Sequence, residues 1–204
     1  MTSRIAFALA LLLAAPAAAQ TTPSASPASA AAAPQDDLVK VALDTAQGRI
    51  VLALDRARAP ATTANFLRYV DARRFDGIGF YRAMPYGQGN GLIQAGITRD
   101  ARLLYPPVSH EPPSRTGLKM EAGAIAMANV GPGTARSDFF ILAGPITTFG
   151  DSFAVFGRVV EGMDVVKAIL ASPVSATRGE GSMKGQMLEP AVPIRSARRV
   201  DAVR

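Results

Sequence analysis

Residues 78–96 read IGFYRAMPYGQGNGLIQAG, and this stretch decides the fold. Residues 78–84 are mostly apolar or aromatic and predict a strand, and residues 92–95 predict a second strand. Glycine and asparagine crowd the connection between them, which predicts a loop. The connection has the glycines of a phosphate-binding loop but lacks its Lys-Ser/Thr pair. We therefore expect a flexible loop rather than a phosphate-binding one.

The chain on both sides of this stretch continues in short strands. Residues 38–43 and 49–54 flank a Gln-Gly turn and predict a hairpin. A helix is expected over residues 62–74, after Pro60, and a second one over residues 163–170. Further strands are expected over residues 124–128, 139–142, 154–160 and 192–200, with mostly loop over residues 97–121. The strands are not interleaved with crossover helices, so about eight short strands and two helices favour a mainly β fold, a β-barrel with capping helices.

Composition excludes several classes of chemistry. The 204 residues include no cysteine and one histidine, His110, which excludes disulfides, cysteine nucleophiles and multi-histidine metal sites. We expect no metal and no cofactor. His110 lies in a loop, and we expect a solvated residue rather than an acid–base catalyst. The net charge of +6 suits anionic partners, but the basic residues are spread along the chain without interleaved aromatics, so we expect no nucleic-acid binding.

The first 37 residues differ from the rest. Residues 1–19 have the parts of a secretory signal peptide: Arg4, an apolar run over residues 5–13, and three alanines before a cleavage site at Gln20. A retained amphipathic anchor is the alternative. Residues 20–37 are rich in Pro, Ser, Thr and Ala and predict a flexible tether. We expect residues 38–204 to form one monomeric domain, periplasmic or secreted, without stable membrane insertion after signal cleavage.

Four sequence blocks, in order along the chain, resemble those of the cyclophilin-type peptidyl-prolyl cis–trans isomerases. The similarity covers roughly residues 39–200. It implies a closed eight-stranded antiparallel cyclophilin-like β-barrel capped by two helices. It also implies an exported bacterial isomerase that acts on proline-containing polypeptides. The blocks are residues 80–85 (FYRAMP) with 93–96 (IQAG), which resemble FHRVIP and IQGG; 123–129 (GAIAMAN), which resemble GxLSMAN; 137–141 (SDFFI), which resemble SQFFI; and 155–163 (VFGRVVEGM), which resemble VFGxVxxGM.

The resemblance also implies the residues of an active site. Arg82 would be the catalytic guanidinium, and Gln94 would contact the substrate carbonyl or orient Arg82. Phe140 would form the floor of a proline pocket, and Phe139 would then fill the core, because adjacent strand residues face opposite ways. The other substrate-binding residues implied are Leu92; Ala128 and Asn129, through backbone groups; and Phe149, Phe153 and Tyr86 in the pocket wall.

Several positions around the pocket depart from the family pattern. Gly91 stands where a pocket phenylalanine is expected, and Tyr86 would fold in to replace it. Thr148 falls where an aromatic residue is common, with Phe149 next to it, and Phe153 replaces a pocket histidine. These departures predict weaker activity or an altered substrate preference. They keep one alternative to the enzyme open, a proline-peptide-binding chaperone with little turnover. The segment of residues 20–37 keeps a second alternative open, a scaffold that this tether spaces from a partner.

Overall fold

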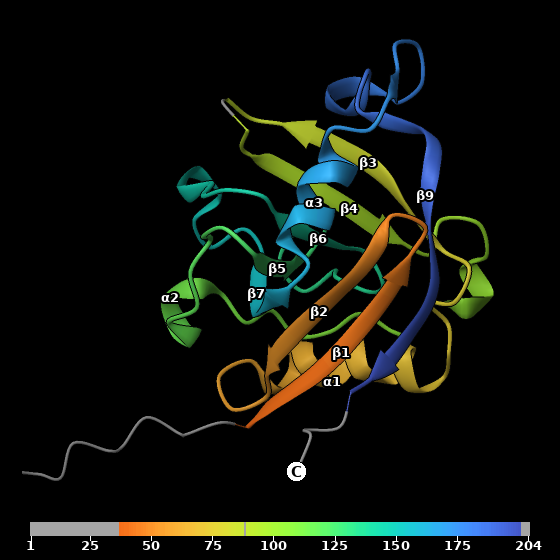
Figure 1. The fold of residues 1–204 in the computed structure, drawn as a ribbon. Helices are drawn as coiled ribbons and strands as arrows, with labels where there is room; N and C mark the ends of the chain where they lie inside the picture. The colour runs from red at the N-terminus through yellow and green to blue at the C-terminus, as the bar shows by residue number, and fades with distance from the viewer. Residues whose placement is uncertain (1–36, 88, 201–204) are drawn as a thin grey trace, which may run out of the picture. The chain divides into compact units, whose positions relative to one another are not determined.

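Eight strands close into a ring in which all neighbours are antiparallel (Figure 1). The computed structural model describes residues 37–87 and 89–200. Strand β9 pairs with both β3 and β1, which closes the ring and confirms the predicted barrel. In ring order the strands are β1 (Leu38–Thr45), β2 (Gly48–Asp55), β7 (Ala154–Glu161), β5 (Ala124–Met127), β6 (Phe139–Leu142), β4 (Gly91–Gly96), β3 (Gly79–Pro85) and β9 (Met187–Arg199).

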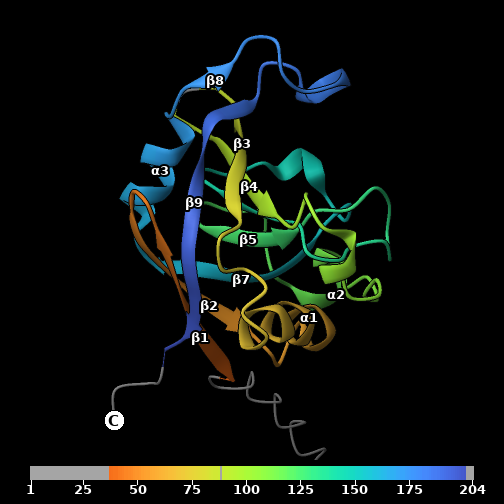
Figure 2. The same ribbon diagram turned by 90° about the vertical axis from the view of Figure 1, so that its right-hand side faces the viewer.

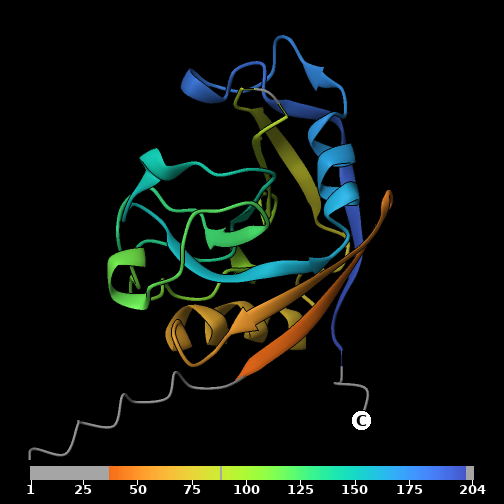
Figure 3. The same ribbon diagram turned by 60° about the vertical axis from the view of Figure 1, so that its left-hand side comes forward.

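Three helices accompany the barrel. Helix α1 (Pro60–Asp71) contacts β2, β7 and β9 and crosses one end of the barrel (Figure 2). Helix α3 (Met163–Leu170) packs against β2, β3 and β4 along its side (Figure 3). Helix α2 (Pro113–Thr116) is a single turn. Of the helices in the described part of the chain, none is long and apolar enough to span a bilayer.

The sequence-based boundaries differ from the structure at a few ends. Helix α1 ends at Asp71 rather than at residue 74, because Arg73 adopts a left-handed conformation (φ 55°) that a helix cannot include. Strand β9 begins at Met187 rather than at residue 192. Prolines in this segment lack an N–H group and weaken its strand signal. A two-residue strand, β8 (Val174–Ser175), pairs with β9 outside the ring and was not predicted.

Two predicted N-terminal segments and a few other residues lie wholly or mostly outside the described part of the chain. The predicted signal peptide, residues 1–19, lies outside the described residues. So does the predicted tether, residues 20–37, except for Asp37. Gln88 and residues 201–204 also lie outside the described residues.

A cluster of phenylalanine rings fills the barrel interior beneath α1. Phe66 of α1 lies 5.0 Å from Phe75, 5.2 Å from Phe139 and 5.3 Å from Phe156, measured between ring centroids. All four side chains are fully buried. Aromatic pairs at such separations and tilts stabilise a core beyond the area that they bury. The cluster ties α1 to strands β6 and β7 and so fixes the end of the barrel.

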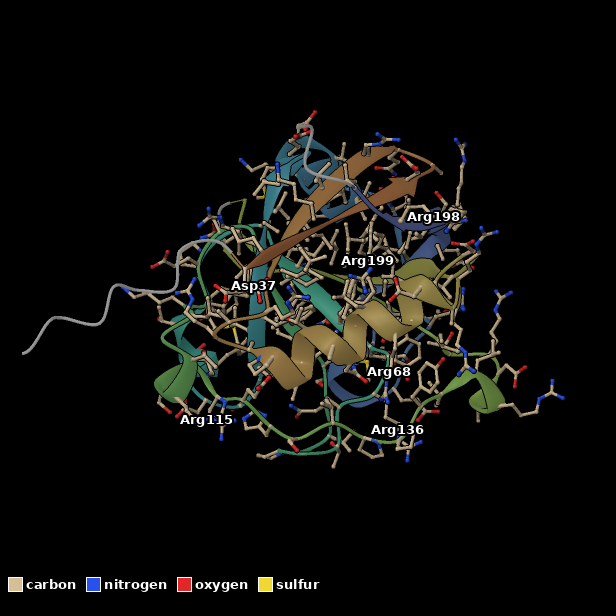
Figure 4. All side chains as sticks on the ribbon, turned by 90° about the horizontal axis from the view of Figure 1, so that it is seen from below. Asp37, Arg68, Arg115, Arg136, Arg198 and Arg199 are labelled. Carbon is tan, nitrogen blue, oxygen red and sulfur yellow. The ribbon has the colours of Figure 1, made fainter. Side chains whose placement is uncertain are left out.

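Ion pairs hold the last strand to the region of α1. Arg199 of β9 donates from Nε and Nη2 to the carboxylate of Asp71, at 2.7 and 2.6 Å. Arg198 makes a similar two-point contact with Asp76, at 2.7 and 2.8 Å. Figure 4 labels both arginines. These hydrogen bonds lower the pKa of both carboxyl groups. The C-terminal end of β9 is therefore anchored where it meets β1.

Glu111 caps helix α1 from a distant loop. The N-cap residue of this helix, Ala59, has no side chain that can accept a hydrogen bond. The Glu111 carboxylate instead accepts the backbone N–H groups of Ala61 and Thr62, at 3.1 and 2.8 Å, and the Thr62 hydroxyl at 2.6 Å. Only 6% of Glu111 is exposed. A negative charge at a helix N-terminus is stabilising, so this contact joins the long loop before α2 to α1.

We expect Glu111→Gln to lower the free energy of unfolding by about 1–2 kcal/mol, because a buried helix cap loses its charge and one acceptor becomes a donor. Urea denaturation measures the change. Glu121→Gln is the matched control, since Glu121 is largely exposed and its nearest cation, Lys119, is 4.0 Å away. Equal stability losses in the two variants would contradict the capping role.

Candidate active site

A cavity of about 590 Å³ lies on the face of β3, β4 and β6 that is turned away from the phenylalanine core. The pairing of these strands places polar and aromatic side chains next to one another at the centre of the cavity wall. Arg82 of β3 pairs with Gln94 of β4, and Gln94 pairs with Phe140 of β6. These three side chains therefore form a row across the sheet. The cavity also contains the other predicted site residues except Tyr86: Leu92, Ala128, Asn129, Phe149 and Phe153.

A β-bulge in β3 turns two consecutive residues toward this cavity. The register of β3 shifts between Phe80 and Arg82 against both β4 and β9. Phe80 and Ala83 are fully buried, whereas Tyr81 and Arg82 both line the cavity. A bulge adds one residue to a strand and can re-aim a side chain. Strict alternation would have placed only one of the two on this face.

Acceptors hold the Arg82 guanidinium on two sides. Its Nε donates to Oε1 of Gln186 (2.8 Å), and its Nη1 donates to Oε1 of Gln94 (2.9 Å). Its Nη2 lies 3.4 Å from the sulfur of Met84, a weaker acceptor. Burial lowers the pKa of Arg82, but a guanidinium starts so high that it stays charged at neutral pH. The result is a fixed cation at the edge of an apolar cavity.

Hydrogen bonds continue from Gln94 toward the interior. Gln94, only 9% exposed, donates from Nε2 to the Tyr81 hydroxyl (2.6 Å). The Tyr81 hydroxyl donates to Oδ1 of Asp138 (2.6 Å), and the Ser137 hydroxyl donates to Oδ2 of Asp138 (3.0 Å). Burial is the main cause that raises the pKa of both Tyr81 and Asp138. Tyr81 therefore keeps its proton at neutral pH.

Three phenylalanines form the apolar wall of the cavity. Phe140 lies 5.9 Å from Phe149 and 5.1 Å from Phe153, and the latter two are 5.1 Å apart. All three pairs meet edge to face, which is a favourable geometry for aromatic rings. Phe139 points instead into the core, where it contacts Phe66. Phe139 and Phe140 thus face opposite sides of the strand, as strand alternation predicts.

The predicted backbone contacts are partly occupied. The N–H group of Ala128 donates to the carbonyl oxygen of Asp138 (2.8 Å), so only the carbonyl of Ala128 remains for a ligand. The side chain of Asn129 is also engaged, since its Nδ2 donates to the Ser152 carbonyl (2.9 Å) and its Oδ1 accepts from Gly131 N–H (3.0 Å). These bonds shape the loop that borders the cavity.

The structure does not bring Tyr86 into the cavity. Its side chain is 49% exposed, and its N–H group closes a turn with the carbonyl of Asn90 (2.9 Å). Gly91 cannot hold a phenylalanine on this backbone, because a Cβ atom there would lie 2.4 Å from the carbonyl oxygen of Met84. Phe149, beside Thr148, takes a place in the wall instead.

Sequence reasoning missed Tyr81, Asp138 and Gln186 as site residues. Tyr81 and Asp138 stand where the family pattern has histidine and glutamine. These two replacements could have indicated from the sequence that both residues belong to the site. Gln186 lies 104 residues after Arg82, and no spacing in the sequence links the two.

His110 lies in a loop outside the cavity, as predicted, but it is half-buried rather than fully solvated. Its Nε2 is 2.7 Å from the carbonyl oxygen of Asp151. Within residues 37–87 and 89–200, no group of three or more His, Cys, Asp or Glu residues is arranged to hold a metal ion.

The arrangement suits a ligand that carries an apolar ring beside a hydrogen-bond acceptor. The phenylalanine wall can take the ring, and the guanidinium of Arg82 can donate to an atom with a free electron pair. The carboxylate of Asp138 and the hydroxyl of Tyr81 are already paired with each other. The site therefore offers binding and electrostatic stabilisation rather than nucleophilic attack.

Comparison with known proteins gives a consistent result. The family profile described as "Cyclophilin type peptidyl-prolyl cis-trans isomerase/CLD" matches residues 38–199. A peptidyl-prolyl cis-trans isomerase of Streptomyces antibioticus is 37% identical over 151 residues, which cover 68% of this chain and 87% of that protein. Peptidyl-prolyl cis-trans isomerase A of Dickeya dadantii is 36% identical over 138 residues, which cover 63% of this chain and 70% of that protein.

Solved structures support the fold. A cyclophilin-type peptidyl-prolyl cis-trans isomerase of Cryptosporidium parvum matches with a TM-score of 0.66 and 19% identity, over 81% of this chain and 99% of that chain. The same protein in the presence of the dipeptide Ala-Pro matches with a TM-score of 0.66 and 18% identity, over 80% of this chain and 99% of that chain.

Proposed function

The chain belongs to the family of cyclophilin-type peptidyl-prolyl cis–trans isomerases, and we propose that its substrates are X–Pro bonds in polypeptides exported from the cell. It is an enzyme of that type, and its substrates are proline-containing peptides. The observation that carries the assignment to this cavity is the row Arg82–Gln94–Phe140, which sets a fixed cation beside an aromatic wall.

The reaction needs no bond to be made or broken. Resonance gives the X–Pro amide partial double-bond character and a rotational barrier of about 18–20 kcal/mol. In the twisted transition state the proline nitrogen becomes pyramidal and regains a lone pair. A donor placed against that nitrogen stabilises the twisted form and not the planar forms. Catalysis then follows from tighter binding of the transition state.

The residues of the cavity divide this work. Phe140, Phe149 and Phe153 bind the proline ring and exclude water from it. Arg82 donates to the proline nitrogen as the amide twists. Gln94 already accepts from Arg82 and donates to Tyr81, so its role is to orient Arg82. Because Gln186 and Gln94 already hold the guanidinium, little reorganisation is needed when the amide twists.

The proposed location is the periplasm or the cell exterior. It rests on the signal-like residues 1–19, with Arg4, the apolar run and the small residues before Gln20. A tether over residues 20–37 would separate the isomerase domain from the site of cleavage. There the enzyme would assist the folding of newly exported polypeptides, because uncatalysed X–Pro isomerisation is slow enough to limit folding.

Removal of the guanidinium tests the catalytic assignment. In an isomerisation assay on a short Ala-Pro peptide, we expect Arg82→Ala to lower kcat/KM about tenfold or more, which corresponds to about 1.4 kcal/mol of transition-state stabilisation. Circular dichroism checks that the variant is folded. Unchanged activity in Arg82→Ala would refute the role of Arg82. A wild-type protein that binds proline peptides without turnover would instead support the chaperone alternative.

The aromatic wall gives a second prediction. Phe149→Ala should raise KM for the Ala-Pro peptide about five- to tenfold, because it removes half-buried aromatic surface that would cover the proline ring. Tyr86→Ala is the matched control and should leave KM within twofold, since Tyr86 lies outside the cavity. A larger effect from Tyr86→Ala than from Phe149→Ala would contradict this description of the pocket.

Export is tested by fractionation of a bacterium that expresses the full chain. We expect a mature protein that begins near Gln20. It should be released by osmotic shock if it is periplasmic, or be found in the culture medium if it is secreted. Deletion of residues 2–19 should leave the protein in the cytoplasm. A full-length protein that stays in the cytoplasm would contradict the proposed location and leave the isomerase assignment untouched.

A further inference from the structure

We propose that Asp138 is a positioning residue, which acts through the Tyr81 hydroxyl to fix the direction of the Gln94 amide and thereby hold Arg82 in place. The inference rests on the proposed role of Arg82 in isomerisation. It concerns two residues that replace those of the family pattern, Tyr81 for histidine and Asp138 for glutamine.

The direction of each hydrogen bond follows from the carboxylate. An ionised carboxylate has only acceptors, so the Tyr81 hydroxyl must donate its proton to Asp138. The oxygen of Tyr81 is then left to accept, and it accepts from Nε2 of Gln94. This turns Oε1 of Gln94 toward the guanidinium of Arg82, which has only donors. Each of these three hydrogen bonds therefore joins a donor to an acceptor.

Reversal of the amide would break this match. A glutamine amide has nearly the same shape in its two orientations, and only its partners select one. With the carboxylate removed, the Tyr81 hydroxyl is free to donate to Gln94. Nε2 of Gln94 would then face Arg82, so that two donors oppose each other. The guanidinium would lose one of its two amide acceptors and would keep only Gln186 and the weaker contact with Met84.

The surroundings of Asp138 are adapted to this role. Its second oxygen accepts from the Ser137 hydroxyl, and that hydroxyl is oriented in turn by the Ile97 N–H group, which donates to Oγ of Ser137 (3.2 Å). Gly96 provides the space, because a Cβ atom there would lie 2.5 Å from Cγ of Asp138. Hydrogen bonds among half-buried groups are stronger than those exposed to bulk water, so this network helps to fix the orientation of its members.

The β3 bulge is what lets the network reach Arg82. Because Tyr81 and Arg82 lie on the same face, the hydroxyl of one and the guanidinium of the other can both contact Gln94. In a regular strand Tyr81 would point into the core. The paired residues Tyr81 and Asp138 thus use a backbone feature that alternation alone does not provide.

Kinetics on the Ala-Pro peptide separate positioning from direct substrate binding. We expect Asp138→Ala and Tyr81→Phe each to lower kcat about tenfold while KM stays within twofold, because a bond that aligns the cation is lost and the pocket remains. Asp164→Ala, at an exposed position of α3, is the control and should leave both constants within twofold.

A double-mutant cycle tests the route through Gln94. In a Gln94→Ala background, Asp138→Ala should lower kcat by no more than a further twofold, because the residue that carries its effect is absent. The proposal is overturned if Asp138→Ala raises KM instead, if its effect on kcat persists in full without Gln94, or if it has no effect. An inactive wild type would instead defeat the proposed function. If Asp138→Ala does not fold, Tyr81→Phe and its cycle with Gln94→Ala decide.

Discussion

The pairing of β9 with both β1 and β3 is the constraint on which the rest of the structure depends. It closes the sheet, removes the exposed edges that an open sheet would present, and joins strands from opposite ends of the described domain. The same strand brings Gln186 beside Arg82, since Arg82 pairs with Met187 in the β3–β9 register. Ion pairs from Arg198 and Arg199 secure its far end. Closure of the barrel and positioning of the guanidinium are therefore two consequences of one strand.

The second determinant of the site is the bulge in β3. It turns Tyr81 and Arg82 to the same side, so that a cation and its supporting hydrogen bonds occupy one face of the sheet. In a reaction without covalent chemistry, rate enhancement depends on how well donors are fixed before the amide twists. The hydrogen-bonded network of this protein, with Gln186 on one side of Arg82 and Gln94 on the other, meets that requirement through short contacts among half-buried groups.

Much of the fold was predictable from local pattern, and less of the site was. Strand alternation and turn residues located the ring strands, and Pro60 located the start of α1, because these signals are local. The start of β9 was missed where prolines weaken a strand signal. All the predicted site residues except Tyr86 line one cavity. Tyr86 begins a glycine-rich loop, and the conformation of such a loop cannot be inferred from the residues next to it in the sequence. The bulge, the contact with Gln186 and the role of Glu111 depend on tertiary pairing, which no local pattern encodes.

In this mechanism the guanidinium acts as a positioned donor and not merely as a positive charge. Arg82→Lys tests it directly, because lysine keeps the charge but lacks the planar fork that contacts Gln186 and Gln94 together. The measurement is the rate of cis–trans exchange of an Ala-Pro peptide at equilibrium, followed by NMR exchange spectroscopy with a catalytic amount of protein. We expect Arg82→Lys to lose about tenfold or more of the wild-type rate. A rate within twofold of wild type would contradict it.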